Sequence, residues 1–109
     1  MTINEFCKKH NVSRKNVDYW TNLGLIQPKV DKTNGYRDYS SVSADDIRKI
    51  ELVKILNNGR ISKADIDRLD DCSQAEWKNK IIPGIHSEYQ NIQSKFVSIL
   101  DYAEARAEE

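Results

Sequence analysis

The sequence is poor in cysteine. Its 109 residues contain only Cys7 and Cys72, and neither belongs to a CxxC pair. This usage indicates a reducing compartment and argues against a disulfide scaffold or a zinc site built on thiolates. We therefore expect a cytoplasmic protein with no metal site and no other cofactor. Cys7 is interpreted as a packing residue, and no sensing role is assigned to Cys72.

Long apolar runs and catalytic motifs are also missing. No segment approaches the roughly 20 apolar residues that cross a bilayer, and the N-terminus lacks the basic and apolar regions of a signal peptide. There is no glycine-rich phosphate loop, no set of paired metal ligands and no nucleophile–base pattern. These absences predict a protein that has no membrane partner and is not an enzyme.

What the chain does contain is an uneven distribution of charge. The net charge is zero, but residues 1–69 carry 13 basic and 9 acidic side chains, a net charge of +4, and the remainder carries −4. A basic segment is typical of a domain that faces a polyanion. Because +4 is modest, the charge alone does not identify a nucleic-acid-binding protein.

Two short helices joined by a tight turn are predicted near the N-terminus. Thr2 and Glu5 have the spacing of a capping box, and Asn11 suits the left-handed position that ends a helix. Ser13 is a candidate N-cap for a second helix over residues 14–22. Helix, short turn and helix together are the arrangement of a helix-turn-helix motif.

A β-hairpin and further helices are expected after this motif. Asn34-Gly35 predicts a two-residue hairpin turn. Ser43 and Ser62 each precede a segment with helical apolar periodicity and are candidate N-caps. A short fifth helix is expected over residues 74–82, and Pro83-Gly84 is expected to interrupt it.

The last segment has the spacing of a coiled-coil seam. Its apolar side chains recur at steps of 4, 3, 4, 3 and 4 residues, which is the a/d pattern of a heptad repeat. The alternative is a helix that packs on its own head, since the seam spans fewer than three heptads. We predict a homodimer through this helix. The candidate dimerisation residues are Ile85, Tyr89, Ile92, Phe96, Ile99 and Ala103.

Several side chains of the second helix and the hairpin are of types that bind DNA. Arginine pairs with guanine and asparagine with adenine, while lysine and tyrosine commonly contact phosphate. An arginine at a hairpin tip suits the minor groove. Packing beneath the hairpin is the alternative for Tyr36 and Tyr39, and a solvated surface is the alternative for the two hairpin lysines. The candidate DNA-binding residues are Ser13, Arg14, Lys15, Asn16, Tyr19, Lys29, Lys32, Tyr36 and Arg37.

Taken together, these segments resemble the N-terminal domain of the mercury-resistance-regulator (MerR) family. The resemblance rests on VSRKNVDYW at residues 12–20, LGLI at 23–26, Pro28 and NGYRDYS at 34–40. It implies a mainly α fold, with a winged helix-turn-helix head of about four helices and a β-hairpin, followed by a C-terminal coiled-coil helix. In this interpretation residues 1–70 are the head, 71–84 a linker with a short helix, and 85–107 the dimerisation helix.

The resemblance also implies a function. Members of the family commonly bind a palindromic promoter site as dimers and distort it so that RNA polymerase can engage. Carried over by position, Arg14 and Tyr19 would be contacts of the recognition helix, and Arg37 would be a contact of the wing. Double-stranded DNA, a second copy of the chain and RNA polymerase are the expected partners.

The sequence departs from the family pattern at Asp18, where the family usually has arginine. A carboxylate there would repel the DNA backbone unless it accepts from a cytosine amino group or pairs with a cation such as Arg14. Two alternative functions stay open. One is an excisionase-like or architectural DNA-binding protein, and the other is a protein-interaction module without DNA affinity.

Overall fold

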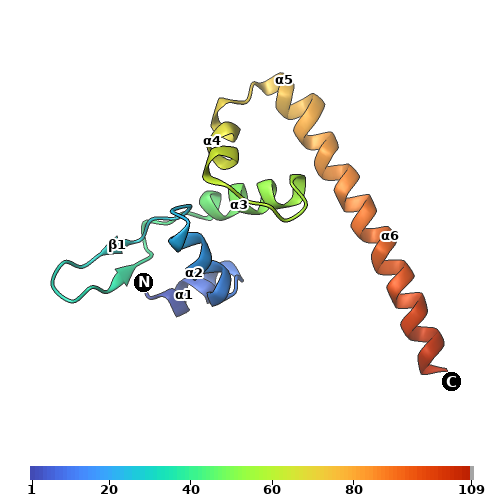
Figure 1. Cartoon of the computed structure of the whole chain (residues 1–109), viewed down its shortest axis with the longest axis horizontal. Coiled ribbons are helices and arrows are strands. Elements are labelled where there is room, and N and C mark those ends of the chain that lie inside the picture. Colours follow the sequence, from blue (N-terminus) through green and yellow to red (C-terminus); the bar gives the residue numbers. More distant parts are fainter. Residues whose placement is uncertain (109) are drawn as a thin grey trace. The chain divides into compact units, whose positions relative to one another are not determined.

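The computed structural model describes residues 1–108, which form two compact units. The first unit, the head, runs from Met1 to Asp71, and the second, the arm, begins at Cys72. The head is mainly helical with one small sheet, and the arm is helical (Figure 1). This confirms the predicted fold class of a winged helix-turn-helix head followed by a C-terminal helix.

The elements follow one another in the order that the sequence predicted. Those of the head are α1 (Ile3–His10), α2 (Arg14–Asn22), β1 (Lys29–Val30), β2 (Arg37–Asp38), α3 (Ala44–Leu56) and α4 (Lys63–Asp71). Those of the arm are α5 (Gln74–Glu76), the π-helical turn η1 (Trp77–Ile81) and α6 (Ile82–Ala107). Among the described residues, none of these helices is both long and apolar enough to span a membrane.

Local capping sets the ends of α1 and α2. The Thr2 hydroxyl accepts from the Glu5 amide, and the Glu5 carboxylate accepts in return from the Thr2 amide, which completes the capping box. Asn11 ends α1 with a φ of 53°, and the Ser13 Oγ accepts from the Asn16 amide at 3.1 Å. The predicted caps are therefore confirmed, and they fix the tight turn between the two helices.

The core of the head joins both helices to the wing and to α3. The Phe6 ring lies 5.3 Å from the Tyr39 ring between centroids, and the Tyr39 hydroxyl lies 3.2 Å from Oγ1 of Thr21 on α2. These contacts fasten the end of the wing against α1 and α2. The buried residues of this cluster are Phe6, Val17, Trp20, Ile26, Tyr39, Val42, Ile47 and Ile50.

The wing is an antiparallel pair of strands in which Lys29 lies opposite Asp38 and Val30 opposite Arg37. The predicted two-residue turn at its tip is wrong. The Asp31 amide donates to the Tyr36 carbonyl at 2.9 Å, so four residues lie between this closing pair.

The reversal begins before Asn34-Gly35. The Asp31 carboxylate accepts from the Thr33 amide at 2.7 Å, and the Asp31 carbonyl accepts from the Gly35 amide at 2.8 Å. Aspartate commonly starts a turn in this way. Gly35 then supplies the left-handed residue that ends the loop, with a φ of 73°.

Two further helices complete the head, and both predicted N-caps are confirmed. Ser43 and Ser62 each accept a hydrogen bond from the backbone amide three residues on. Gly59 is left-handed at the end of α3, and its amide donates to the carbonyl of Lys54. Lys49 of α3 pairs with Asp70 of α4, with 2.8 Å between Nζ and Oδ1.

The arm departs from the sequence prediction at Pro83-Gly84. The chain is helical without a break from Gln74 to Ala107, so the expected interruption does not occur. The turn immediately before the proline is π-helical, and the Ile82 amide donates to the Trp77 carbonyl five residues earlier. A proline normally clashes with the carbonyl four residues before it. For Pro83 this is the carbonyl of Asn79, which lies within the π-helical turn. The wider backbone of a π turn explains how the helix accommodates the proline.

Asp38 connects the wing to the start of the chain. Its Oδ1 accepts from the Ser40 hydroxyl at 2.6 Å, from the Met1 ammonium at 2.9 Å and from the Ser40 amide at 3.0 Å. The hydrogen bond from the Ser40 side chain, followed by that from the Met1 ammonium, holds the pKa of this carboxyl well below its usual range.

The low pKa of Asp38 predicts a pH-dependent contribution to stability. The unfolded chain protonates this carboxylate more readily than the folded one, so its contribution is full above the ordinary carboxyl pKa of about 4 and is lost as pH falls below it. We expect the difference in free energy of unfolding between wild type and Asp38→Asn to shrink steadily below about pH 4. Denaturant unfolding across pH measures it, with Asp101→Asn on the arm as control. A difference that stays constant with pH would contradict the assignment.

Candidate nucleic-acid interface

Helix α2 has one buried and one exposed face. Val17 and Trp20 point into the core. Arg14, Asp18 and Tyr19 lie on the outer side, where the side chains of Arg14 and Asp18 are 64% and 47% exposed. Since α2 is the second helix of the helix-turn-helix, this outer face is the one that such motifs present to the major groove.

The remaining candidates at the start of α2 differ in how free they are. Lys15 is exposed, and Asn16 is half-buried. The Ser13 oxygen accepts the capping hydrogen bond from Asn16, which leaves its hydroxyl proton available as a donor. The assignment of all three to DNA contact stays a prediction.

The wing presents most of its side chains to solvent. Tyr36 is 75% exposed, whereas Tyr39 is buried in the core. The alternative of packing beneath the hairpin therefore holds for Tyr39 and not for Tyr36. Arg37, Lys29 and Lys32 are exposed, so the wing carries a row of accessible cations.

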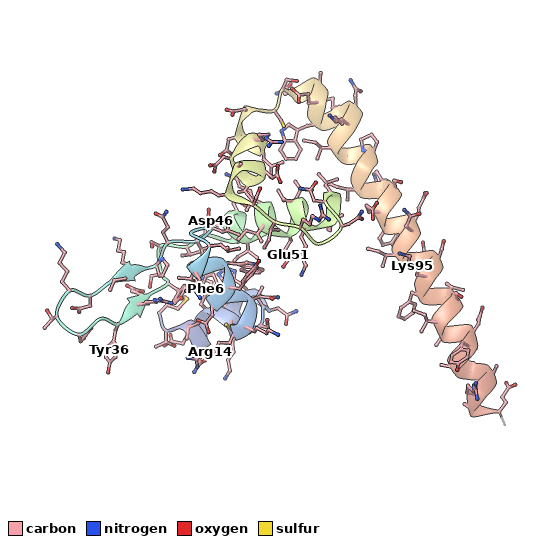
Figure 2. The ribbon with its side chains drawn as sticks, in the orientation of Figure 1. Phe6, Arg14, Tyr36, Asp46, Glu51 and Lys95 are labelled. Atoms are coloured by element: carbon pink, nitrogen blue, oxygen red, sulfur yellow. The ribbon has the colours of Figure 1, made fainter. Side chains whose placement is uncertain are left out.

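A groove of about 410 Å³ lies between α2 and the wing. Figure 2 shows the side chains of Arg14 and Tyr36 on the same side of the head, at the lower edge of the view. The groove thus connects α2 to the wing in a single surface. Its lining residues are Thr2, Ile3, Arg14, Asp18, Gly35, Tyr36, Arg37 and Tyr39.

The groove brings together three of the predicted DNA-binding residues, namely Arg14, Tyr36 and Arg37. The other six do not line it, although Lys15 and Tyr19 of α2 and the wing residues Lys29 and Lys32 are exposed. Sequence reasoning missed Thr2 and Ile3 as lining residues. They border the groove because the start of α1 packs beside the wing, and no local pattern signals that tertiary contact.

An ion pair crosses the groove face of α2. Nε of Arg14 lies 3.9 Å from Oδ2 of Asp18, one helical turn further on. Of the two arrangements that the sequence left open for Asp18, this structure shows the pairing with Arg14. Exposed pairs of this type stabilise a helix only slightly, by about 0.3–0.5 kcal/mol. The pair therefore matters more for where the guanidinium lies than for stability.

Neither cysteine belongs to a cluster of metal-ligand side chains in the described residues of the chain. No group of three or more His, Cys, Asp or Glu side chains there could hold a metal ion. Cys7 is half-buried against the core, and burial raises the pKa of its thiol. The thiol is accordingly protonated at neutral pH and packs as a small apolar group.

An exposed second helix with an arginine in its first turn, beside a cationic β-hairpin, is the arrangement typical of winged helix-turn-helix DNA-binding proteins. A family model described as "MerR HTH family regulatory protein" matches residues 1–71. The chain belongs to this family, and it is a DNA-binding transcriptional regulator. Neither a curated protein nor a solved structure was found to match it.

Proposed function

We propose that the protein binds a palindromic promoter site as a homodimer, reads its sequence through α2, and regulates transcription by distorting the DNA. The observation that carries the proposal is the groove between α2 and the wing, with Arg14 on one side and Arg37 on the other. An α-helix fits the major groove of B-DNA. The wing then lies over the adjacent backbone and minor groove, so one head spans both grooves.

Base edges and phosphates call for different side chains. Arg14 stands in the first turn of α2, with its side chain directed outward. An arginine there donates two hydrogen bonds to guanine. Arg37 stands on β2, from which it contacts phosphate or a narrow minor groove. Lys29, Lys32 and Tyr36 add phosphate contacts from the wing in this arrangement.

The arm supports the proposed homodimer. Four large side chains of the predicted seam, Tyr89, Ile92, Phe96 and Ile99, are each more than half exposed. Ile85 is half-buried, and Ala103 is exposed at the far end. Contiguous apolar surface of this kind marks an association site, and a second copy of α6 offers the same heptad spacing in return.

A two-fold dimer accounts for the palindrome and for the distortion. Two identical heads related by a two-fold axis read two half-sites of opposite orientation. If the dimer fixes the distance between the heads, DNA whose half-sites do not match that distance has to bend or untwist. A promoter changed in this way alters its fit to RNA polymerase, which is the proposed route to regulation.

Selection of bound sequences from a random DNA pool tests the proposal. We expect a symmetric site with two half-sites. Direct repeats bound cooperatively by monomers would instead favour the excisionase-like or architectural alternative. A protein that binds all DNA weakly and without salt dependence would favour the interaction module, because phosphate contacts weaken steeply with salt.

The proposed roles of α2 and the wing predict that replacing Arg14 and replacing Arg37 will affect DNA binding in different ways. Arg14→Ala is expected to weaken the free energy of binding to the selected site by about 1–3 kcal/mol and to relax the sequence preference at one base pair. Arg37→Ala should weaken binding to all sequences evenly and make the salt slope shallower by about one unit per protomer.

Binding isotherms on the selected and a scrambled site, measured across salt concentrations, compare the two variants. Arg48→Ala is the matched control, because Arg48 is an exposed arginine of α3 that does not line the groove. If Arg14→Ala keeps both the affinity for DNA and the preference for the selected site, the assignment of α2 as the sequence-reading helix is wrong.

A further inference from the structure

The acidic side chain in the groove is unexpected for a surface that faces DNA. Among the described residues that line the groove, Asp18 alone is acidic, and it shares the lining with Arg14 and Arg37. Even paired with Arg14, this carboxylate reduces the net positive charge that the groove presents to phosphate, so it lowers affinity for DNA of any sequence. A residue that weakens binding in general needs a compensating effect on binding to the correct site.

The geometry of the Arg14–Asp18 pair supplies such an effect. Oδ2 of Asp18 lies 3.9 Å from Nε of Arg14, an ion-pair distance longer than a hydrogen bond. A contact on the Nε side leaves the two terminal NH2 groups to donate end-on. An arginine that reads guanine uses two parallel N–H donors aimed at O6 and N7. Arg14 is otherwise a long, exposed side chain with many rotamers, and ordering it on binding costs conformational entropy.

Water is displaced when DNA fills the groove, and the pair then lies in a medium of lower dielectric constant. The attraction between guanidinium and carboxylate becomes stronger there than in the free protein. The arginine is therefore held most firmly at the moment when it meets a base edge. An arginine held in one place donates well to guanine and poorly to bases that would require it to swing aside.

We propose that Asp18 is a positioning residue for sequence reading: it holds the Arg14 guanidinium against guanine and raises specificity while lowering general affinity. The inference rests on the proposed DNA-reading role of α2. It differs from direct reading by Asp18, in which the carboxylate would accept from a cytosine amino group and define a second base pair independently of Arg14.

The test measures base discrimination, which a merely structural role would not change. Binding constants are compared on the selected site and on the three variants of the base pair that Arg14→Ala identifies. Asp18→Ala is expected to lower the preference for guanine by about fivefold or more, the lower end of what a bidentate contact contributes. Its affinity for scrambled DNA should rise at the same time.

Two further variants and one control sharpen the test. Asp18→Glu keeps a carboxylate within reach of Arg14 and should restore most of the discrimination. The double variant Arg14→Ala/Asp18→Ala should discriminate no worse than Arg14→Ala alone, since Asp18 acts through Arg14. Asp45→Ala removes the carboxylate of the Arg48–Asp45 pair, 3.0 Å apart on α3 and outside the groove. Asp45→Ala should change neither the preference for guanine nor the affinity for scrambled DNA.

The possible outcomes distinguish a failure of the positioning role of Asp18 from a failure of the proposed function. Unchanged guanine preference in Asp18→Ala, with sequence-specific binding intact in wild type, overturns the positioning role alone. Direct reading by Asp18 predicts a different result, in which Asp18→Ala changes the preference at a second base pair and Arg14→Ala leaves that preference intact. This result would overturn the positioning role in favour of direct reading. A wild-type protein that selects no sequence at all overturns the proposed function, and the role of Asp18 with it.

Discussion

Replacing Ile92 and Phe96 together by aspartate is expected to convert the proposed dimer into monomers. Both side chains lie on the exposed apolar seam of α6, where they are 57% and 66% exposed. Covering a large apolar side chain contributes about 1.5–3 kcal/mol, and each substitution acts twice in a symmetric dimer. The aspartates would also bring unpaired charges into the seam. We expect dimerisation to weaken by at least about 1000-fold, which is roughly 4 kcal/mol.

Sedimentation equilibrium at micromolar concentration measures this change. Ser94→Asp/Ser98→Asp is the matched control, because it adds the same two charges on the side of α6 away from the seam. The control should stay dimeric, and the seam variant should keep a folded head while losing high affinity for the full palindrome. A monomeric wild type, or a seam variant that still dimerises, would contradict the proposed interface.

Replacing Trp20 by alanine is expected to have the largest effect on the stability of the head. The Trp20 side chain is 1% exposed and lies in the core shared by the helices and the wing. Removing a buried large aromatic side chain usually costs about 3–5 kcal/mol. Small domains are stable by only about 5–15 kcal/mol in total. The variant head should therefore be marginally folded at room temperature.

Tyr19 provides the control for this substitution. It is also aromatic and immediately precedes Trp20 on α2, but it is more than half exposed. Tyr19→Ala should change the free energy of unfolding by no more than about 0.5 kcal/mol while weakening DNA binding if its hydroxyl contacts phosphate. Urea unfolding followed by circular dichroism compares the two. Equal losses of stability in both variants would contradict the orientation of α2.

Features that depend on near neighbours could be predicted from the sequence. The caps at Thr2, Ser13, Ser43 and Ser62 require only a side-chain oxygen and a backbone amide three residues on. The left-handed end of α1 at Asn11 is equally local. Helix positions and the order of elements were therefore accessible without tertiary information.

The errors arose where one local signal competed with another. Asn34-Gly35 is a strong turn signal, but Asp31 starts the reversal earlier through its own side chain. Pro83 is a strong helix breaker, but the preceding π turn accommodates it. The contribution of Thr2 and Ile3 to the groove depends on tertiary packing beside the wing, which no sequence spacing encodes.

The π-helical turn at Trp77–Ile81 has a consequence for the angular phase of the arm. A π turn contains one residue more than the corresponding α turn, and each residue of an α-helix advances by about 100°. Every side chain of α6 is therefore rotated by about that angle about the helix axis, compared with a regular helix continued from α5. This one extra residue, which precedes the seam, therefore sets the direction of the helix face that carries Ile92 and Phe96 relative to α5.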